Sequence, residues 1–201
     1  IGAVNTVVVR SGGKLHGYNT DYVGVLQTLE RRIKLRRSRV LIVGAGGAAH
    51  AVAFAVAQAG AAVFVTARRY QRAKYLARTV GGEAVKRAAV RRMAFDAIVN
   101  TTPVGMHPSV ARSPLEADEL NCRLVFDIIY RPRATKLLQM AMRRGIQTVS
   151  GLEMFVAQGA EQWKLWIGDQ APVAPMRRAV LHMLSSEDNS RRSGGSRGKR
   201  R

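Results

Sequence analysis

The sequence predicts an α/β fold in which a doubly wound parallel sheet carries helices on both faces. Short apolar runs suited to buried strands alternate with segments of helical spacing along most of the chain. The 201 residues include 19 Gly and only 6% aromatic residues, which favours helices packed closely on a sheet over an aromatic-rich β-sandwich. The length suffices for one domain with a core, or for one domain and part of another.

The first 36 residues fit this alternation less well, and we interpret them as the remnant of an N-terminal α/β lobe with a connecting helix. A strand is expected over residues 3–9, followed by a turn at Ser11-Gly12-Gly13 and a return strand through Leu15. Asn19-Thr20-Asp21 then supplies helix-start residues, and apolar residues follow at helical spacing up to Ile33.

The sheet domain is expected over residues 37–150. Its strands are predicted at 39–43, 62–66, 96–100, 124–128 and 148–149, with a short one within 84–90, and its helices at 48–59, 69–80 and 134–144. Two closing helices, at about 151–167 and 174–185, make up a region over 151–186. Residues 187–201 contain no apolar residue, so we predict a disordered basic tail there.

The strongest local motif joins the first strand of the sheet domain to the helix after it. Val43-Gly44-Ala45-Gly46-Gly47-Ala48-Ala49 matches the G-x-G-x-x-G/A fingerprint of dinucleotide-binding folds. Gly44 permits a tight turn, Gly46 lets the backbone approach a pyrophosphate, and the small Ala49 lets the helix sit close on the strand. Free N–H groups at the helix start then bind the anion. The motif predicts a Rossmann-like nucleotide site at residues 44–48.

The end of the second strand indicates which dinucleotide binds. NAD sites usually place Asp or Glu there for the ribose 2′-OH, whereas this chain has Ala67-Arg68-Arg69-Tyr70-Gln71-Arg72. A carboxylate would repel a 2′-phosphate, and a guanidinium binds it with two parallel hydrogen bonds. Arg68 and Arg72 are four residues apart and are expected to face one site from the helix start. We therefore predict NADP as the cofactor, the alternative being that these arginines are simply solvated.

The chain is strongly basic, with 33 Lys and Arg against 13 Asp and Glu, a formal net charge of +20. A dense basic cluster covers residues 31–39. The charge favours anionic ligands and nonspecific nucleic-acid binding. No nucleic-acid-binding motif accompanies it, so we expect no specific nucleic-acid partner.

Several classes of site and location are excluded by simple counts. The single cysteine rules out an intrachain disulfide and a multi-cysteine zinc site, and the four histidines lack metal-ligand spacing, so no metal is expected. No apolar run is long enough to cross a bilayer, and the N-terminus lacks the layout of a signal peptide. We predict a cytoplasmic protein without membrane partners.

Six short motifs, taken in their order along the chain, resemble the shikimate dehydrogenase family. They are Gly2-Ala-Val-Asn-Thr6, Gly17-Tyr-Asn-Thr-Asp-Tyr-Val-Gly24, Gly44 to Ala49, Asn100-Thr-Thr-Pro-Val-Gly-Met106, Phe126-Asp-Ile-Ile-Tyr-Arg-Pro132 and Gly151-Leu-Glu-Met-Phe-Val-Ala-Gln158. The Asn-Thr-Asp segment and the Gly…Met…Gln segment are more specific than the glycine loop. The resemblance extends to about residue 185.

The resemblance implies a reversible, NADPH-dependent reduction of 3-dehydroshikimate to shikimate, in the pathway to chorismate and the aromatic amino acids. It implies that Asp21 is one half of a catalytic acid–base pair. It further implies that Asn5 and Asp21 contact substrate hydroxyls, and that Tyr130 and Gln158 are further substrate contacts.

The resemblance also assigns the cofactor side. Residues 44–48 would bind the pyrophosphate, and the segment 67–72 the adenosine 2′-phosphate, although Ala67 stands where the family usually has Asn. Thr101 and Thr102 would border the cofactor, and Ile128 and Gly151 would lie near the nicotinamide.

The chain departs from the family in having no counterpart of the N-terminal substrate lobe. That lobe carries a Ser-x-Ser pair for the substrate carboxylate and the Lys that partners the Asp; neither Lys14 nor Lys34 has the family's motif around it. Ketone reduction needs a proton donor beside the hydride donor. The absence of the lysine should therefore lower the rate on the order of 10²–10⁴-fold. We interpret the chain as the C-terminal part of such an enzyme, either a truncated gene or the end of a bifunctional chain with a dehydroquinate dehydratase domain upstream. A homodimer is a further arrangement left open.

Two other interpretations stay open. One is a quinate/shikimate dehydrogenase using NAD, against which the arginines argue. The other is a nucleotide-binding or nucleic-acid-binding module without catalysis, which would use the sheet domain and the basic tail.

Overall fold

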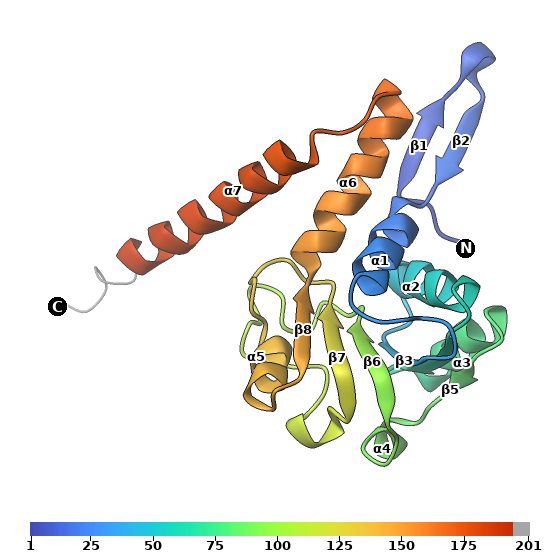
Figure 1. Cartoon of the computed structure of the whole chain (residues 1–201), viewed down its shortest axis with the longest axis vertical. Helices are drawn as coiled ribbons and strands as arrows, with labels where there is room; N and C mark the ends of the chain where they lie inside the picture. The colour runs from blue at the N-terminus through green and yellow to red at the C-terminus, as the bar shows by residue number, and fades with distance from the viewer. Residues whose placement is uncertain (195–201) are drawn as a thin grey trace.

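A computed structural model describes residues 1–194 of the chain, in which six parallel strands form one sheet (Figure 1). The strands are β3 (Arg39–Val43), β4 (Ala62–Thr66), β5 (Glu83–Ala84), β6 (Phe95–Asn100), β7 (Cys122–Asp127) and β8 (Gln147–Ser150). Their order in the sheet is β5-β4-β3-β6-β7-β8, so the chain winds outward from β3 in one direction and from β6 in the other. In sheets of this kind ligands bind outside the carboxyl ends of the strands, where the winding reverses.

Two hydrophobic cores lie on the two faces of the sheet, which confirms the predicted doubly wound arrangement. Val40 and Ile42 of β3 belong to one core, and Leu41 and Val43 belong to the other. The first core contains residues of α1 (Thr20–Glu30), α2 (Gly47–Gln58) and α3 (Tyr70–Thr79); the second contains residues of α4 (Arg87–Val90) and α5 (Lys136–Arg143). Because both faces are covered, the central strands are apolar almost throughout.

The first residues form the predicted hairpin, in which β1 (Thr6–Val9) pairs antiparallel with β2 (Leu15–Tyr18). A 3₁₀ turn at Ser11–Gly13 joins the two strands. The chain then enters α1, where the Asn19 side chain caps the helix by accepting a hydrogen bond from the Tyr22 N–H at 3.3 Å.

Helix α6 (Gly151–Ile167) connects the sheet to the hairpin, as Figure 1 shows. Its first turn follows β8 directly, and near its end the Trp166 indole N–H donates to the Val7 carbonyl at 3.3 Å. Helix α1 packs against α6 at Gly24, where a Cβ atom would lie 2.9 Å from the Met154 carbonyl oxygen. A side chain at Gly24 would therefore push the two helices apart.

Helix α7 (Val173–Gly194) runs away from the rest of the molecule after packing its middle turns on α6 (Figure 1). Leu184 joins Leu152 and Val156 in a small apolar cluster, and Arg177 pairs with Glu153 at 2.9 Å. Within residues 1–194, none of the helices is both long and apolar enough to cross a membrane.

Two predicted elements differ from the structure. The strand expected within 84–90 is limited to β5, two residues long, and the chain then turns into α4. Arg87 fixes that turn, because its guanidinium binds both the Glu119 carboxylate and the Pro114 carbonyl. The second closing helix, expected to end at 185, continues to Gly194 and so extends into the segment 187–201 for which disorder is predicted. No Gly or Pro interrupts residues 176–193, and helical backbone is therefore permitted there. Residues 195–201 of the predicted tail lie outside the described residues.

Candidate active site

The glycine loop between β3 and α2 is shaped for a backbone contact with an anion. Gly44 has a φ of +128°, and a Cβ there would lie 2.3 Å from the Thr101 hydroxyl oxygen. Gly46 caps α2 without a side-chain hydrogen bond, and a Cβ at Gly46 or Gly47 would meet nothing within 4 Å. Buried Ala49 lets the helix lie close to the sheet. The first N–H groups of α2 therefore lie beside open space. Free N–H groups at the start of a helix are an arrangement that binds phosphate.

A cavity of about 390 Å³ extends from this loop to the start of α3. Its lining residues are Gly44, Ala45, Gly46, Ala67, Arg68, Arg69, Arg72, Thr101, Thr102, Pro103 and Val104. Three of them are exposed arginines, and no carboxylate is among them. Gly47 and Ala48, predicted with the loop, belong to α2 and do not line the cavity.

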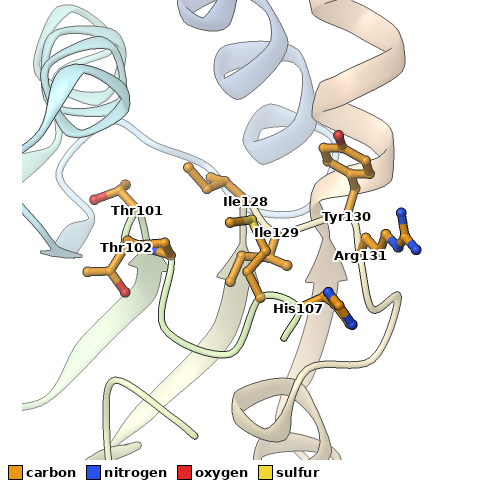
Figure 2. A pocket seen from close by; sticks show the side chains of 9 residues that line it. Thr101, Thr102, His107, Ile128, Ile129, Tyr130 and Arg131 are labelled. Carbon is orange, nitrogen blue, oxygen red and sulfur yellow. The ribbon is translucent and has the colours of Figure 1, made fainter. Parts of the chain in front are cut away.

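A second cavity, of about 450 Å³, adjoins the first and shares Thr101, Thr102 and Pro103 with it. The remaining lining residues are Met106, His107, Ile128, Ile129, Tyr130 and Arg131. Figure 2 shows Thr101 and Thr102 on one side, Ile128 and Ile129 in the middle, and Tyr130 with Arg131 beside α6. The two cavities thus form one cleft along the carboxyl ends of β3, β6 and β7.

A buried hydrogen-bond network holds the two loops that line the second cavity. The Asp127 carboxylate accepts from the Asn100 amide at 3.0 Å, from the Ile129 N–H at 3.1 Å and from the Thr135 hydroxyl at 2.6 Å. The Asn100 side-chain oxygen in turn accepts from the N–H of Thr102 at 2.9 Å and from its hydroxyl at 2.8 Å. Each loop is therefore tied to the same carboxylate.

Burial raises the pKa of Asp127 to about 6, and the hydrogen bonds from Thr135, Ile129 and Asn100 oppose that rise. Three donors for one carboxylate leave few of its lone pairs unused. The geometry therefore makes Asp127 a positioning residue for the cleft, directed into the protein and away from the ligand space.

A second polar group forms where the hairpin, α1 and α6 meet. The Asn5 side-chain oxygen accepts from the Thr20 N–H and from the Thr6 hydroxyl, both at 2.9 Å. The Thr20 hydroxyl lies 3.3 Å from the Gln158 side-chain oxygen. Burial raises the pKa of the neighbouring Asp21, and a side-chain hydrogen bond with Asn5 opposes it. The structure brings together Asn5, Asp21 and Gln158 from segments up to 153 positions apart (158 − 5).

Tyr130 links this polar group to the cleft. Its ring stacks on Phe155 of α6 with centroids 4.4 Å apart and planes at 25°, and it also lines the second cavity. The Gln158 amide donates to the Phe155 carbonyl at 3.0 Å, so both residues are fixed on one stretch of α6. The residues expected on the substrate side therefore follow one another from the hairpin to the cleft.

Gly151 has a different surrounding from the one the resemblance suggests. It is buried at the start of α6 and is not among the residues lining either cavity. A Cβ there would lie 1.9 Å from the Ile128 carbonyl oxygen, so the absence of a side chain is what lets α6 begin against the loop after β7.

Sequence reasoning missed several residues of the cleft. Arg69 lines the first cavity, although within the segment 67–72 only Ala67, Arg68 and Arg72 were selected individually, and exposed His107 lines the second. His107 directly follows the motif over 100–106, which was the available signal. The network role of Asp127 depends on Thr135 in the next element and carries no local signal.

Acidic and metal-ligating side chains are sparse around the site. Asp21 makes no ion pair with any other described residue. Residues 1–194 contain no group of three or more His, Cys, Asp or Glu that could hold a metal ion.

Comparison with known protein families gives two matches that together span most of the described chain. A family described as shikimate / quinate 5-dehydrogenase matches residues 27–136, and one described as the shikimate 5′-dehydrogenase C-terminal domain matches residues 151–181. The first begins within α1 and runs through the glycine loop, the arginines and the Asp127 network, and the second covers all of α6 and the first part of α7.

Individual proteins extend this similarity over nearly the whole chain. Shikimate dehydrogenase (NADP(+)) of Methanosarcina acetivorans is 43% identical over an alignment of 197 residues, and the match covers 92% of this chain and 70% of that protein. The bifunctional 3-dehydroquinate dehydratase/shikimate dehydrogenase of Arabidopsis thaliana is 39% identical and covers 86% of this chain, which matches 32% of that protein. The structure of the Thermus thermophilus enzyme in complex with NADP(H) and shikimate superimposes with a TM-score of 0.82 at 38% identity, over 90% of this chain and 68% of that one.

Proposed function

The chain belongs to the shikimate dehydrogenase family, and we propose that it binds NADPH in the cleft and carries part of the site for the reversible reduction of 3-dehydroshikimate to shikimate. The observation that carries the proposal is the order of the cleft. The glycine loop and three arginines lie at one end, and Tyr130 leads to Asn5, Asp21 and Gln158 at the other.

The residues of the first cavity fit a dinucleotide phosphate. Gly46 and Gly47 leave open space where any side chain would project, which the pyrophosphate requires. Arg68, Arg69 and Arg72 offer guanidinium groups to a 2′-phosphate, and no carboxylate lines the cavity to repel it. When bound, the nicotinamide supplies the hydride for ketone reduction.

The protein's own contribution to the reaction is proton transfer and orientation on the substrate side. Reduction turns the ketone oxygen into an alkoxide that needs a proton, and oxidation needs a base at the same place. Burial raises the pKa of Asp21 and so favours its protonated form, which can donate. Asn5 and Gln158 would orient the substrate hydroxyls around Asp21, and Tyr130 would close the path toward the cleft.

We further infer that the substrate side is completed by groups that these 201 residues do not supply. Among residues 1–194 Asp21 forms no ion pair with a lysine, and Lys14 lies in the hairpin turn and Lys34 in the loop before β3. The bifunctional relative of Arabidopsis supports one arrangement, in which further domains share a chain with a region similar to this one. A homodimer is the other arrangement to be tested, by the mass of the native particle.

Charge removal at the arginines tests the cofactor proposal. We compare the Kd of NADPH and of NADH, by calorimetry, for the unmodified chain, the variant Arg68→Gln/Arg72→Gln and the control Arg78→Gln/Arg143→Gln. The control removes two exposed positive charges that line neither cavity. With about 1.5–3 kcal/mol for each charged hydrogen bond, the first variant should weaken NADPH binding about 100-fold or more. NADH binding and the control should change less than about twofold.

Each other result excludes a specific part of the proposal. Equal affinity for NADPH and NADH in the unmodified chain would contradict the NADP preference and favour a quinate/shikimate dehydrogenase that uses NAD. Tight NADPH binding without shikimate-dependent NADP⁺ reduction would mean that this stretch of chain is a cofactor-binding module. Turnover by the isolated chain would show that another group replaces the lysine.

A further inference from the structure

Apart from the cofactor cleft, a further concave site lies in the loop between α1 and β3, at the amino end of β3. We call it the basic hollow. It has a volume of about 540 Å³ and is lined by Glu30, Arg31, Arg32, Ile33, Lys34, Leu35, Arg36 and Ala59. The cofactor cleft lies at the carboxyl ends of the strands, so the two sites occupy opposite ends of β3 and share no residue.

The backbone of the basic hollow is fixed from inside the protein. Leu35 is 3% exposed and belongs to the first core, against which Ile33 also packs. The Ser38 hydroxyl donates to the Leu35 carbonyl at 2.7 Å, and the Arg37 N–H donates to the Gly60 carbonyl at 2.8 Å. Arg37 has a φ of +65°, a conformation that non-glycine residues rarely adopt. These anchors direct the intervening charged side chains outward in a set order.

The side chain of Arg36 is itself positioned by a close neighbour. A Cβ at Gly60, whose φ is +81°, would lie only 3.5 Å from the Arg36 Cγ atom. The stem of Arg36 therefore runs across Gly60, along the edge of the hollow.

The cations of the hollow are not neutralised by neighbouring acids. Arg31, Arg32, Lys34 and Arg36 are all exposed, and none forms an ion pair or side-chain hydrogen bond within the described part of the chain. Elsewhere, by contrast, arginines meet acids, as in Arg87 with Glu119 and Arg123 with Asp96. Glu30 is the one acid that lines the hollow. Four like charges held together on an anchored loop repel one another unless an anion joins them.

We propose that the basic hollow binds a compact anion with closely spaced phosphates, such as a phosphoanhydride chain of three phosphates. A small polyanion matches a concave site whose lining includes four cations and a single acid. Single-stranded nucleic acid is disfavoured because its binding sites add aromatic side chains for base stacking, and no aromatic residue lines this hollow.

The experiment measures binding of inorganic tripolyphosphate by calorimetry at about 150 mM salt, where the Debye length is about 8 Å and diffuse attraction is screened. Saturating NADPH is present throughout to occupy the cofactor cleft. The variant Arg31→Gln/Arg32→Gln/Lys34→Gln removes three charges from the hollow. Its control is Arg92→Gln/Arg143→Gln/Lys164→Gln. These three residues are exposed and line neither the cofactor cleft nor the basic hollow.

We expect one tripolyphosphate per chain and a loss of affinity of roughly tenfold or more in the hollow variant, the size expected from losing even one charged hydrogen bond. The control should stay within about twofold. Glu30→Gln should tighten binding, because it removes the single repelling carboxylate. All of these variants change exposed residues, so NADPH binding should be unaffected and reports that the chain is folded.

Other ligands distinguish the source of the phosphates. Equal affinity for tripolyphosphate and ATP supports a site that recognises only the phosphate chain, and tighter binding of ATP supports a nucleotide as the ligand. Equal losses in the hollow variant and in its control would overturn the proposal, because the attraction would then belong to the whole basic surface. Tighter binding of a 12-nucleotide single-stranded RNA through the same residues would overturn it in favour of nucleic acid.

Discussion

On the cofactor side of the cleft, backbone turns and exposed arginines are backed by a fully buried hydrogen-bond network, whereas on the substrate side Asn5 is exposed and Asp21 and Gln158 are half-buried. Asn100 and Asp127 have no exposed surface and meet at 3.0 Å. Thr20 and Gln158, across the α1–α6 contact, meet at 3.3 Å. The two sides thus differ in how completely their polar groups are enclosed by the protein.

The hairpin reinforces this contrast. Val9 and Leu15 are 67% and 71% exposed on a sheet of only two strands. Two-stranded sheets are marginal without further strands or a packed face. The sheet domain, by comparison, has cores on both faces. Mutations should therefore lower the free energy of unfolding most at the start of α6, where the two sides meet. The loss should be smaller within the cofactor side and smallest within the substrate side.

The largest effect is expected for Gly151→Ala, at the start of α6. Its Cβ would lie 1.9 Å from the Ile128 carbonyl oxygen, and the backbone would have to move. We expect a loss of about 4 kcal/mol or more in the free energy of unfolding, measured by chemical denaturation, and weaker NADPH binding. Gly159→Ala in the same helix is the matched control, because its Cβ would meet only the flexible end of Met176 at 3.3 Å. It should be neutral or stabilise by about 0.5–1 kcal/mol, and equal losses in both would refute the steric argument.

The next largest effect is expected within the cofactor side, for Asp127→Ala. The substitution leaves the Asn100 amide, the Ile129 N–H and the Thr135 hydroxyl without their acceptor. Since each unsatisfied buried group costs about 1–3 kcal/mol, we expect a loss of about 3 kcal/mol in unfolding free energy. NADPH affinity should also fall, because both loops of the second cavity lose their anchor. Asp118→Ala, at a 60% exposed side chain, should stay within about 0.5 kcal/mol.

The same carboxyl group predicts a pH dependence of smaller size. The pKa of Asp127 is about 6 in the folded protein against an ordinary 3.8, so the folded state holds more protons between these values. This group's contribution to stability is therefore greatest at low pH, falls as pH rises from about 4 to 6, and is constant above. Relative to the unmodified chain, Asp127→Asn should gain up to about 1.4 kcal/mol per pH unit across that window in denaturation experiments. A constant difference between the two proteins would contradict the raised pKa.

The parts of this comparison that could be predicted from sequence are those with local patterns. The apolar run at 39–43 and the glycines after it specify strand, turn and helix from neighbouring residues, and β3, the loop and α2 follow accordingly. The extent of β5 could not be predicted, because Arg87 turns the chain by binding Glu119, 32 residues away. The role of Asp127 could not be predicted for the same reason, since its partners Asn100, Ile129 and Thr135 come from three separate segments. Contacts that close only in three dimensions leave no periodic trace in the sequence.

The smallest effect is expected on the substrate side, for Thr20→Val. The Thr20 hydroxyl lies 3.3 Å from both the Asn5 and the Gln158 side-chain oxygens, and its single hydrogen can serve only one of them. Asn5 already accepts two hydrogen bonds at 2.9 Å, so the hydroxyl should favour Gln158. We expect a loss of about 1 kcal/mol in unfolding free energy and no change in NADPH affinity. A double-mutant cycle with Gln158→Leu should show a coupling of about 0.5–1 kcal/mol, whereas a cycle with Thr102→Val, on the cofactor side, should show additivity. Coupling of Thr20 to Thr102 as strong as its coupling to Gln158 would mean that the two sides of the cleft are one cooperative unit, and the distinction between them would fail.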